Sequence, residues 1–233
     1  MNNKTMVFVW SRNIRLFHWI NVLAILLLAA IGIVIFNGKF LGLTTEAKIT
    51  LKTIHVLVGY VFAINLLLRL FLGLVGQGYE RFGAFLPFMP GFIGELKAFK
   101  QGSSKVHKGH NPAGKIMVAA LLVMMLNQMI TGLVLAGTDI YYPPLGGHFA
   151  ESVAKDKTKI ALIKPYSKEN VDQVAYKEMR AFRKPFILMH VYGFYILIAL
   201  IPLHIAGVIY AERKEKASIV SAMISGYKSL PKQ

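Results

Sequence analysis

Four apolar segments, each long enough to cross a lipid bilayer, constrain this chain more than any other feature. They are Phe17 to Phe36, Ile54 to Val75, Ile116 to Ala136 and Phe186 to Tyr210. About 20 apolar residues in a helix span the hydrocarbon core of a bilayer. Hydrophobic residues make up 55% of the chain, and its mean hydropathy is +0.51. We therefore predict an all-α membrane protein, a single domain over residues 1–233 folded as a four-transmembrane-helix bundle.

The basic residues predict the orientation of this bundle. The net charge is +16, but the basic residues lie between apolar runs instead of forming one motif, which argues against nucleic-acid binding. An even number of spans places both termini on one side. The two tails, the connection between the second and third spans, and Arg69 together hold 15 of the 27 basic residues. Because cytoplasmic loops are enriched in Lys and Arg, we expect both termini to be cytoplasmic.

Two connections are predicted to have structure of their own. In the inner connection, Phe92, Ile93, Leu96 and Phe99 recur at helical spacing beside basic residues, which is compatible with an interfacial helix or with an ordinary loop. The outer connection, residues 137–185, is longer than most loops. Connections of that length are usually functional or disordered, and we favour a small lid that faces a partner.

Histidines mark three of the four apolar segments. His18 and His204 lie at the predicted inner level, and His55 and His190 lie at the outer level. An ionisable residue within a span is expected to be functional. His190 and His204 are fourteen residues apart, so they project from nearly the same helix face about 21 Å apart along the axis. Each is therefore expected to face the histidine at its own depth.

Two facing imidazoles at each depth predict two haems in the core, because bundle cores commonly hold cofactors. The chain has no cysteine, so any metal or haem must be held by nitrogen, oxygen or methionine sulfur. With both axial positions occupied by protein, the iron has no open site, and its role is electron transfer. Two other interpretations stay open: hydrogen bonds between helices, or zinc or copper sites, which the spans do not complete with carboxylates or thiolates.

Three further residues fit a large anionic cofactor. Arg69 lies fourteen residues beyond His55, hence on nearly the same face but at the inner level, where a haem propionate would neutralise it. Arg15, one turn before His18, fits the same role or that of a positive anchor at the membrane surface. Gly59, one turn after His55, would let a macrocycle approach the backbone, or would serve close helix packing.

The other candidate residues receive simpler interpretations. Gly193 has the same two interpretations as Gly59. Asn127 and Gln128 would contact a ligand or quinone, or form hydrogen bonds between helices, which we favour. The remaining three histidines are expected to lie in loops or in solvent, and Asn111-Pro112 is expected to start a helix; these histidines are His107, His110 and His148.

An ordered set of motifs resembles the prokaryotic cytochrome b561 family, and more narrowly the b-type cytochrome subunits of membrane nickel–iron hydrogenases. The motifs are RLFHW, HVLVGY followed by Arg69 in RLFLGLVG, GHNPAGK, GTDIYYPP, and the His190/His204 pair. The resemblance runs from about Val9 to Tyr227. One departure is visible: Leu70, Phe71 and Leu72 stand where relatives commonly have a Tyr-Trp pair.

This resemblance implies two non-covalent b haems, with His18, His55, His190 and His204 as axial ligands. It also implies a location in the bacterial inner membrane and exchange of electrons between quinone and a partner, often a periplasmic redox protein. A hydrogenase partner does not follow, because the family includes stand-alone cytochromes. A homo-oligomer is compatible with the sequence. Two alternatives stay open: a haem-free proton-coupled transporter that uses the histidines as a relay, and a membrane anchor with structural haem.

Overall fold

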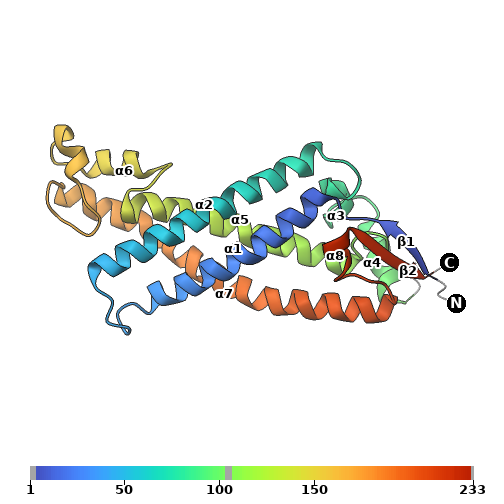
Figure 1. Ribbon diagram of the computed structural model, residues 1–233. Helices are drawn as coiled ribbons and strands as arrows, with labels where there is room; N and C mark the ends of the chain where they lie inside the picture. Colours follow the sequence, from blue (N-terminus) through green and yellow to red (C-terminus); the bar gives the residue numbers. More distant parts are fainter. Residues whose placement is uncertain (1–3, 103–106, 232–233) are drawn as a thin grey trace. The chain divides into compact units, whose positions relative to one another are not determined.

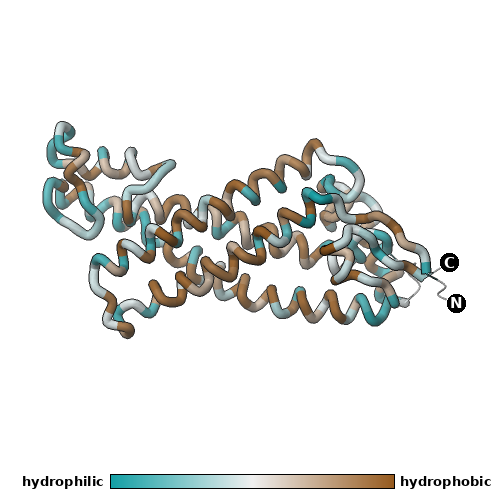
Figure 2. Tube along the Cα trace, in the orientation of Figure 1, coloured by the Kyte–Doolittle hydropathy of each residue, from teal (hydrophilic) through white to brown (hydrophobic). Residues whose placement is uncertain are grey.

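Four long helices dominate the structure, a computed structural model that describes residues 4–102 and 107–231. They are α1 (Arg12–Phe36), α2 (Thr45–Val75), α5 (Pro112–Ile140) and α7 (Gln173–Glu215). Within the described residues, these are the helices long and apolar enough to cross a membrane, and the mean hydropathy of their most apolar windows is 2.1 to 2.8. The four predicted spans are therefore confirmed as helices. Figure 2 shows their hydrophobic character, in contrast to the largely hydrophilic connection around α6.

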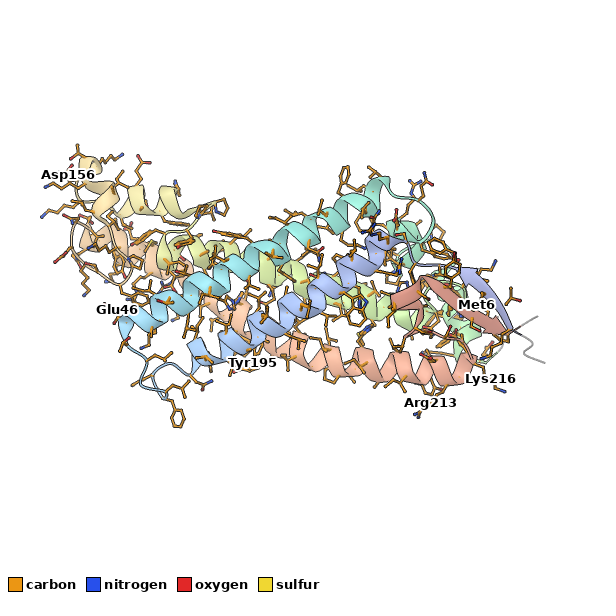
Figure 3. All side chains as sticks on the ribbon, viewed as in Figure 1. Met6, Glu46, Asp156, Tyr195, Arg213 and Lys216 are labelled. Carbon is orange, nitrogen blue, oxygen red and sulfur yellow. The ribbon has the colours of Figure 1, made fainter. Side chains whose placement is uncertain are left out.

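Polar caps explain why these helices start before the apolar segments. The Thr44 hydroxyl accepts a hydrogen bond from the Ala47 amide at 3.1 Å, ahead of Glu46 in the first turn of α2 (Figure 3). Asn111 accepts from the Gly114 amide at 2.8 Å, which confirms the helix start predicted at Asn111-Pro112. Such side chains satisfy amides that have no partner within the helix.

α7 begins well before its apolar segment, so its first turns lie within the outer connection. Asp172 accepts hydrogen bonds from the amides of Val174 and Ala175 at 2.9 and 2.8 Å, and the helix then continues through Pro185. Residues 141–172 therefore join α5 to α7, and the expected connection between the two spans, residues 137–185, includes the adjoining ends of both helices. The first turns of α7 are polar, so hydropathy alone did not reveal them.

The chain divides into two compact units. The first unit comprises Met1–Asn21, Asn65–Met125 and Ile196–Gln233, and the second comprises Val22–Ile64 and Leu126–Tyr195. Each long helix therefore contributes one part to each unit. The predicted inner histidines fall in the first unit and the predicted outer histidines fall in the second.

The first unit contains a small sheet that the all-α prediction did not include. β1 (Lys4–Phe8) pairs antiparallel with β2 (Tyr227–Pro231), with Phe8 opposite Tyr227 (Figure 1). A buried cluster of Val9, Trp10, Ile14 and Ala222 adjoins the sheet. Each strand has only five residues, and the two come from opposite ends of the chain, so local sequence carries almost no signal for the pairing.

Short helices complete the first unit. They are η1 (Gly78–Glu80), α3 (Phe82–Phe85), α4 (Phe92–Lys100) and α8 (Ala222–Ser225). The helical spacing predicted from Phe92 to Phe99 is confirmed by α4. Ile93 on α4 is 70% exposed, and the location of this helix at a membrane surface stays a prediction.

The second unit contains the folded outer connection. It includes α6 (Gly146–Val153) and η2 (Lys157–Leu162), followed by the bridge between Ala154 and Val171. Val153, Val171 and Met179 form its buried core, while Asp156 lies in the exposed part (Figure 3). This connection is therefore an ordered element packed on the start of α7.

Candidate functional site

His55 on α2 and His190 on α7 face one another in the second unit. Their ring centroids are 6.3 Å apart, with 70° between the ring planes. An imidazole nitrogen binds a transition metal at about 2 Å, so two imidazoles on opposite sides of one metal place their centroids about 6 Å apart. The observed separation therefore fits two axial ligands of a single iron, and it is too long for a direct hydrogen bond between the rings.

Glycines on two neighbouring helices make room for these rings. A Cβ at Gly32 of α1 would lie 3.4 Å from Cε1 of His55, and a Cβ at Gly132 of α5 would lie 3.5 Å from Cε1 of His190. Around Gly59, one turn after His55, a Cβ would meet nothing within 4 Å. The role of Gly59 beside a flat cofactor stays a prediction.

α5 holds the backbone and the ring of His190 in place. Gln128 donates to the His190 carbonyl at 2.9 Å, and Asn127 donates to the Met189 carbonyl at 3.1 Å, which confirms the favoured role of these amides in joining helices. A Cβ at Gly193 would lie 2.2 Å from Nδ2 of Asn127, so Gly193 serves close helix packing. The Thr131 hydroxyl lies 2.8 Å from Nδ1 of His190.

His18 on α1 and His204 on α7 both lie in the first unit. The indole of Trp19 meets the His18 ring edge-on, with 5.1 Å between centroids. Nδ1 of His18 and both polar atoms of the Asn21 amide, one turn later, are buried without a hydrogen-bond partner in the described part of the chain. Unpaired buried polar atoms are costly, and a polar ligand in this region would relieve that cost.

Arg69 is buried in the same unit, with 6% of the residue exposed. It donates to the Glu80 carbonyl at 2.9 Å, and its guanidinium lies 4.2 Å from the Phe85 ring centroid. The Phe17 ring centroid lies 5.9 Å from the guanidinium, and the charge of Glu80 offsets only part of the cost of burying this cation. An anionic group such as a propionate would complete its environment.

Arg15 and His110 have contacts that the sequence did not predict. Arg15 donates to the Ile224 carbonyl and lines, with Arg12 and Trp19, a cavity of about 300 Å³. His110 lies in a loop as expected, but its ring packs against Trp10 at 4.8 Å between centroids.

The surroundings of His110 keep this side chain neutral. Burial, together with the positive charges of Lys228 and Arg69, lowers the pKa of His110 to about 3. Sequence reasoning missed His110, Asn21 and Thr131 because their contacts come from distant segments. The motif GHNPAGK was the only sequence signal for His110.

Comparison with known proteins bears on this arrangement. The family model described as prokaryotic cytochrome b561 matches residues 9–226. This chain belongs to the prokaryotic cytochrome b561 family. The protein is accordingly a multi-pass membrane b-type cytochrome that functions in electron transport, and the family implies b-type haem.

Two relatives carry a more specific description. A probable Ni/Fe-hydrogenase B-type cytochrome subunit from Rhizobium leguminosarum bv. viciae is 24% identical, over 94% of this chain and 87% of the relative. A protein of the same description from Cupriavidus necator is 23% identical, over 95% of this chain and 86% of the relative. The similarity covers most of each protein, so it includes all four long helices of this cytochrome.

Proposed function

We propose that this protein is a di-haem b-type cytochrome of the bacterial inner membrane that passes single electrons between a redox partner at its outer face and membrane quinone. The observation that supports the proposal most is the placement of His55 and His190, with ring centroids 6.3 Å apart. His18 of α1 and His204 of α7, both in the first unit, are the proposed second ligand pair.

The residues of each site bind and orient the cofactor. When bound, haem supplies reversible one-electron chemistry. The two histidines of a pair would bind the iron, which would leave no open position there for oxygen or another small ligand. Arg69 offers a positive charge to a propionate at the inner site, and Arg15 is a second candidate for such a charge. Gly59 leaves space for the macrocycle at the outer site.

The names of the two relatives suggest the class of partner. Both are described as cytochrome subunits of Ni/Fe hydrogenases, so a hydrogenase-type or other periplasmic redox protein is the proposed partner. The ordered connection over residues 141–172 is the proposed contact surface. Membrane quinone is the proposed second substrate, and a homo-oligomer is compatible with both.

Histidine substitutions test the ligand pairs. We expect purified protein to contain two haems per chain by pyridine haemochrome assay, with the spectrum of six-coordinate b haem. His190→Ala should lose the outer haem and His204→Ala the inner one, because each substitution removes one of two axial ligands. His148→Ala, a change at an exposed histidine of α6, is the matched control and should keep both haems.

The outcomes separate this proposal from its alternatives. A folded but colourless preparation would support a haem-free transporter. Two haems retained in either ligand variant would overturn the ligand assignment. Reconstituted vesicles that hold haem but pass no electrons from an external donor to quinone would indicate a membrane anchor.

A further inference from the structure

Thr131 is the one hydroxyl in the described chain that contacts a proposed ligand ring. It lies on α5, only 2% of the residue is exposed, and its Oγ1 lies 2.8 Å from Nδ1 of His190. The preceding turn of the same helix holds the His190 carbonyl through Gln128. α5 therefore contacts His190 at both its backbone and its ring.

The hydroxyl proton of Thr131 is directed away from His190. Oγ1 lies 2.6 Å from the Asn127 carbonyl oxygen, a separation typical of an O–H···O hydrogen bond. The carbonyl can only accept, and a threonine hydroxyl has one proton, so that proton lies between the two oxygens. A lone pair of Oγ1 then faces His190, and Nδ1 of the ring must carry the proton that it donates to Thr131.

This assignment leaves the other ring nitrogen free. An imidazole that is protonated at Nδ1 presents the lone pair of Nε2 to a metal, and the hydrogen bond at Nδ1 fixes the tautomer and the rotation of the ring. We propose that Thr131 is the positioning residue of His190, holding this ligand with Nε2 toward the iron of the outer haem. The inference rests on the proposed di-haem function.

The effect of Thr131 should be confined to one haem. Nδ1 of His55 and Nδ1 of His18 are both buried without a hydrogen-bond partner among the described residues. A hydrogen bond donated from Nδ1 makes the imidazole a stronger donor to the metal, which favours the ferric over the ferrous state. Thr131 therefore lowers the midpoint potential of the haem that His190 binds.

Three variants of the full-length membrane protein test this inference. Thr131→Val removes the acceptor at nearly constant volume, and Thr131→Ser restores it. Thr138→Val is the matched control, since Thr138 is also 2% exposed on α5 and donates to the carbonyl four residues earlier, that of Val134, at 2.9 Å. The readouts are the haem content and the midpoint potentials from a spectroelectrochemical titration. The redox transition that is absent from His190→Ala is assigned to the outer haem.

We expect Thr131→Val to weaken outer-haem binding by about tenfold or more, and to raise the potential of any outer haem retained. A tenfold change in the ferric-to-ferrous preference corresponds to about 59 mV for one electron. Thr131→Ser and Thr138→Val should behave as the unsubstituted protein. If Thr131→Val even abolishes outer-haem binding, rescue by serine still supports the role.

Other results would contradict the role of Thr131 but would leave the proposed di-haem function unaffected. Unchanged haem content and potentials in Thr131→Val would show that Thr131 does not position the ligand. A shift confined to the inner haem, or an equal shift in Thr138→Val, would do the same. The proposed function fails separately, if His190→Ala retains two haems.

Discussion

Buried polar residues other than the histidines also characterise the proposed inner haem site of this protein. Arg69 and Asn21 are 6% and 5% exposed, although burying a charge or an unpaired amide costs free energy. Both lie in the first unit, and Asn21 has no hydrogen-bond partner within the described residues. Polar groups retained at such a cost are consistent with the proposed binding of a polar ligand in this region.

The charge of Arg69 should tune the inner haem. Arg69→Gln is expected to lower the midpoint potential of that haem, because a nearby cation stabilises the added electron. A unit charge at about 10 Å contributes on the order of 1–2 kcal/mol at an effective dielectric constant of about 20, which corresponds to tens of millivolts. A redox titration measures the shift. Arg81→Gln, at an exposed position, is the control and should leave the midpoint potentials of both haems unchanged. An unchanged midpoint potential of the inner haem in Arg69→Gln would exclude the propionate role.

At the scale of elements, α5 makes ion pairs and hydrogen bonds with its neighbouring helices in the second unit. Its Asp139 forms ion pairs with Lys52 of α2 and Arg183 of α7. After its end, the Tyr60 hydroxyl of α2 donates to the Pro143 carbonyl at 2.5 Å. The turn from α5 into α6 is thus held against α2, so its backbone geometry should influence the stability of the unit.

Two adjacent glycines at the start of α6 should differ in how much their replacement by alanine changes the stability of the protein. A Cβ at Gly146 would lie 2.1 Å from the Tyr141 carbonyl oxygen, whereas at Gly147 it would meet nothing within 4 Å. Because the obstacle is backbone, Gly146→Ala is expected to cost about 1–3 kcal/mol, as overpacking does. Gly147→Ala should be neutral or slightly stabilising within α6. Thermal unfolding in detergent compares them, and equal midpoints would contradict the tight turn.

At the scale of the whole molecule, the pairing of β1 with β2 constrains the topology. The two strands come from opposite ends of the chain and form one sheet, so both ends must lie on the same side of the membrane. This placement of the two ends agrees with the four helices of spanning length, because an even number of spans returns the chain to the side where it started. Which side that is stays a prediction: the distribution of Lys and Arg favours cytoplasmic ends.

Reporter fusions test this orientation. Alkaline phosphatase is expected to be inactive when fused to the C-terminus and active when inserted in the exposed outer connection near Ser167, because it folds only outside the cytoplasm. A fluorescent protein that folds only in the cytoplasm should give the opposite pattern. The reverse result with both reporters would place the termini outside and exchange the inner and outer assignments.

Much of the architecture could be predicted because its signals are local. Bilayer-length apolar segments predicted the four helices, and Asn111-Pro112 predicted the start of α5. The fourteen-residue spacing of His190 and His204 assigned them to one face, which led to the pairing of His190 with His55. The starts of α2 and α7 escaped prediction, because polar caps and not hydropathy set them.

The sequence by itself therefore determined the membrane class, the number of helices of membrane-spanning length and the histidines that are candidate ligands. It could do so because periodicity and hydropathy are properties of neighbouring residues. Only the tertiary structure decided which groups surround those histidines. Thr131 lies 59 positions from His190, and Arg15 bonds to Ile224 across 209 positions. Such contacts depend on how closely helices dock and on their rotation about their axes, and no local pattern encodes either.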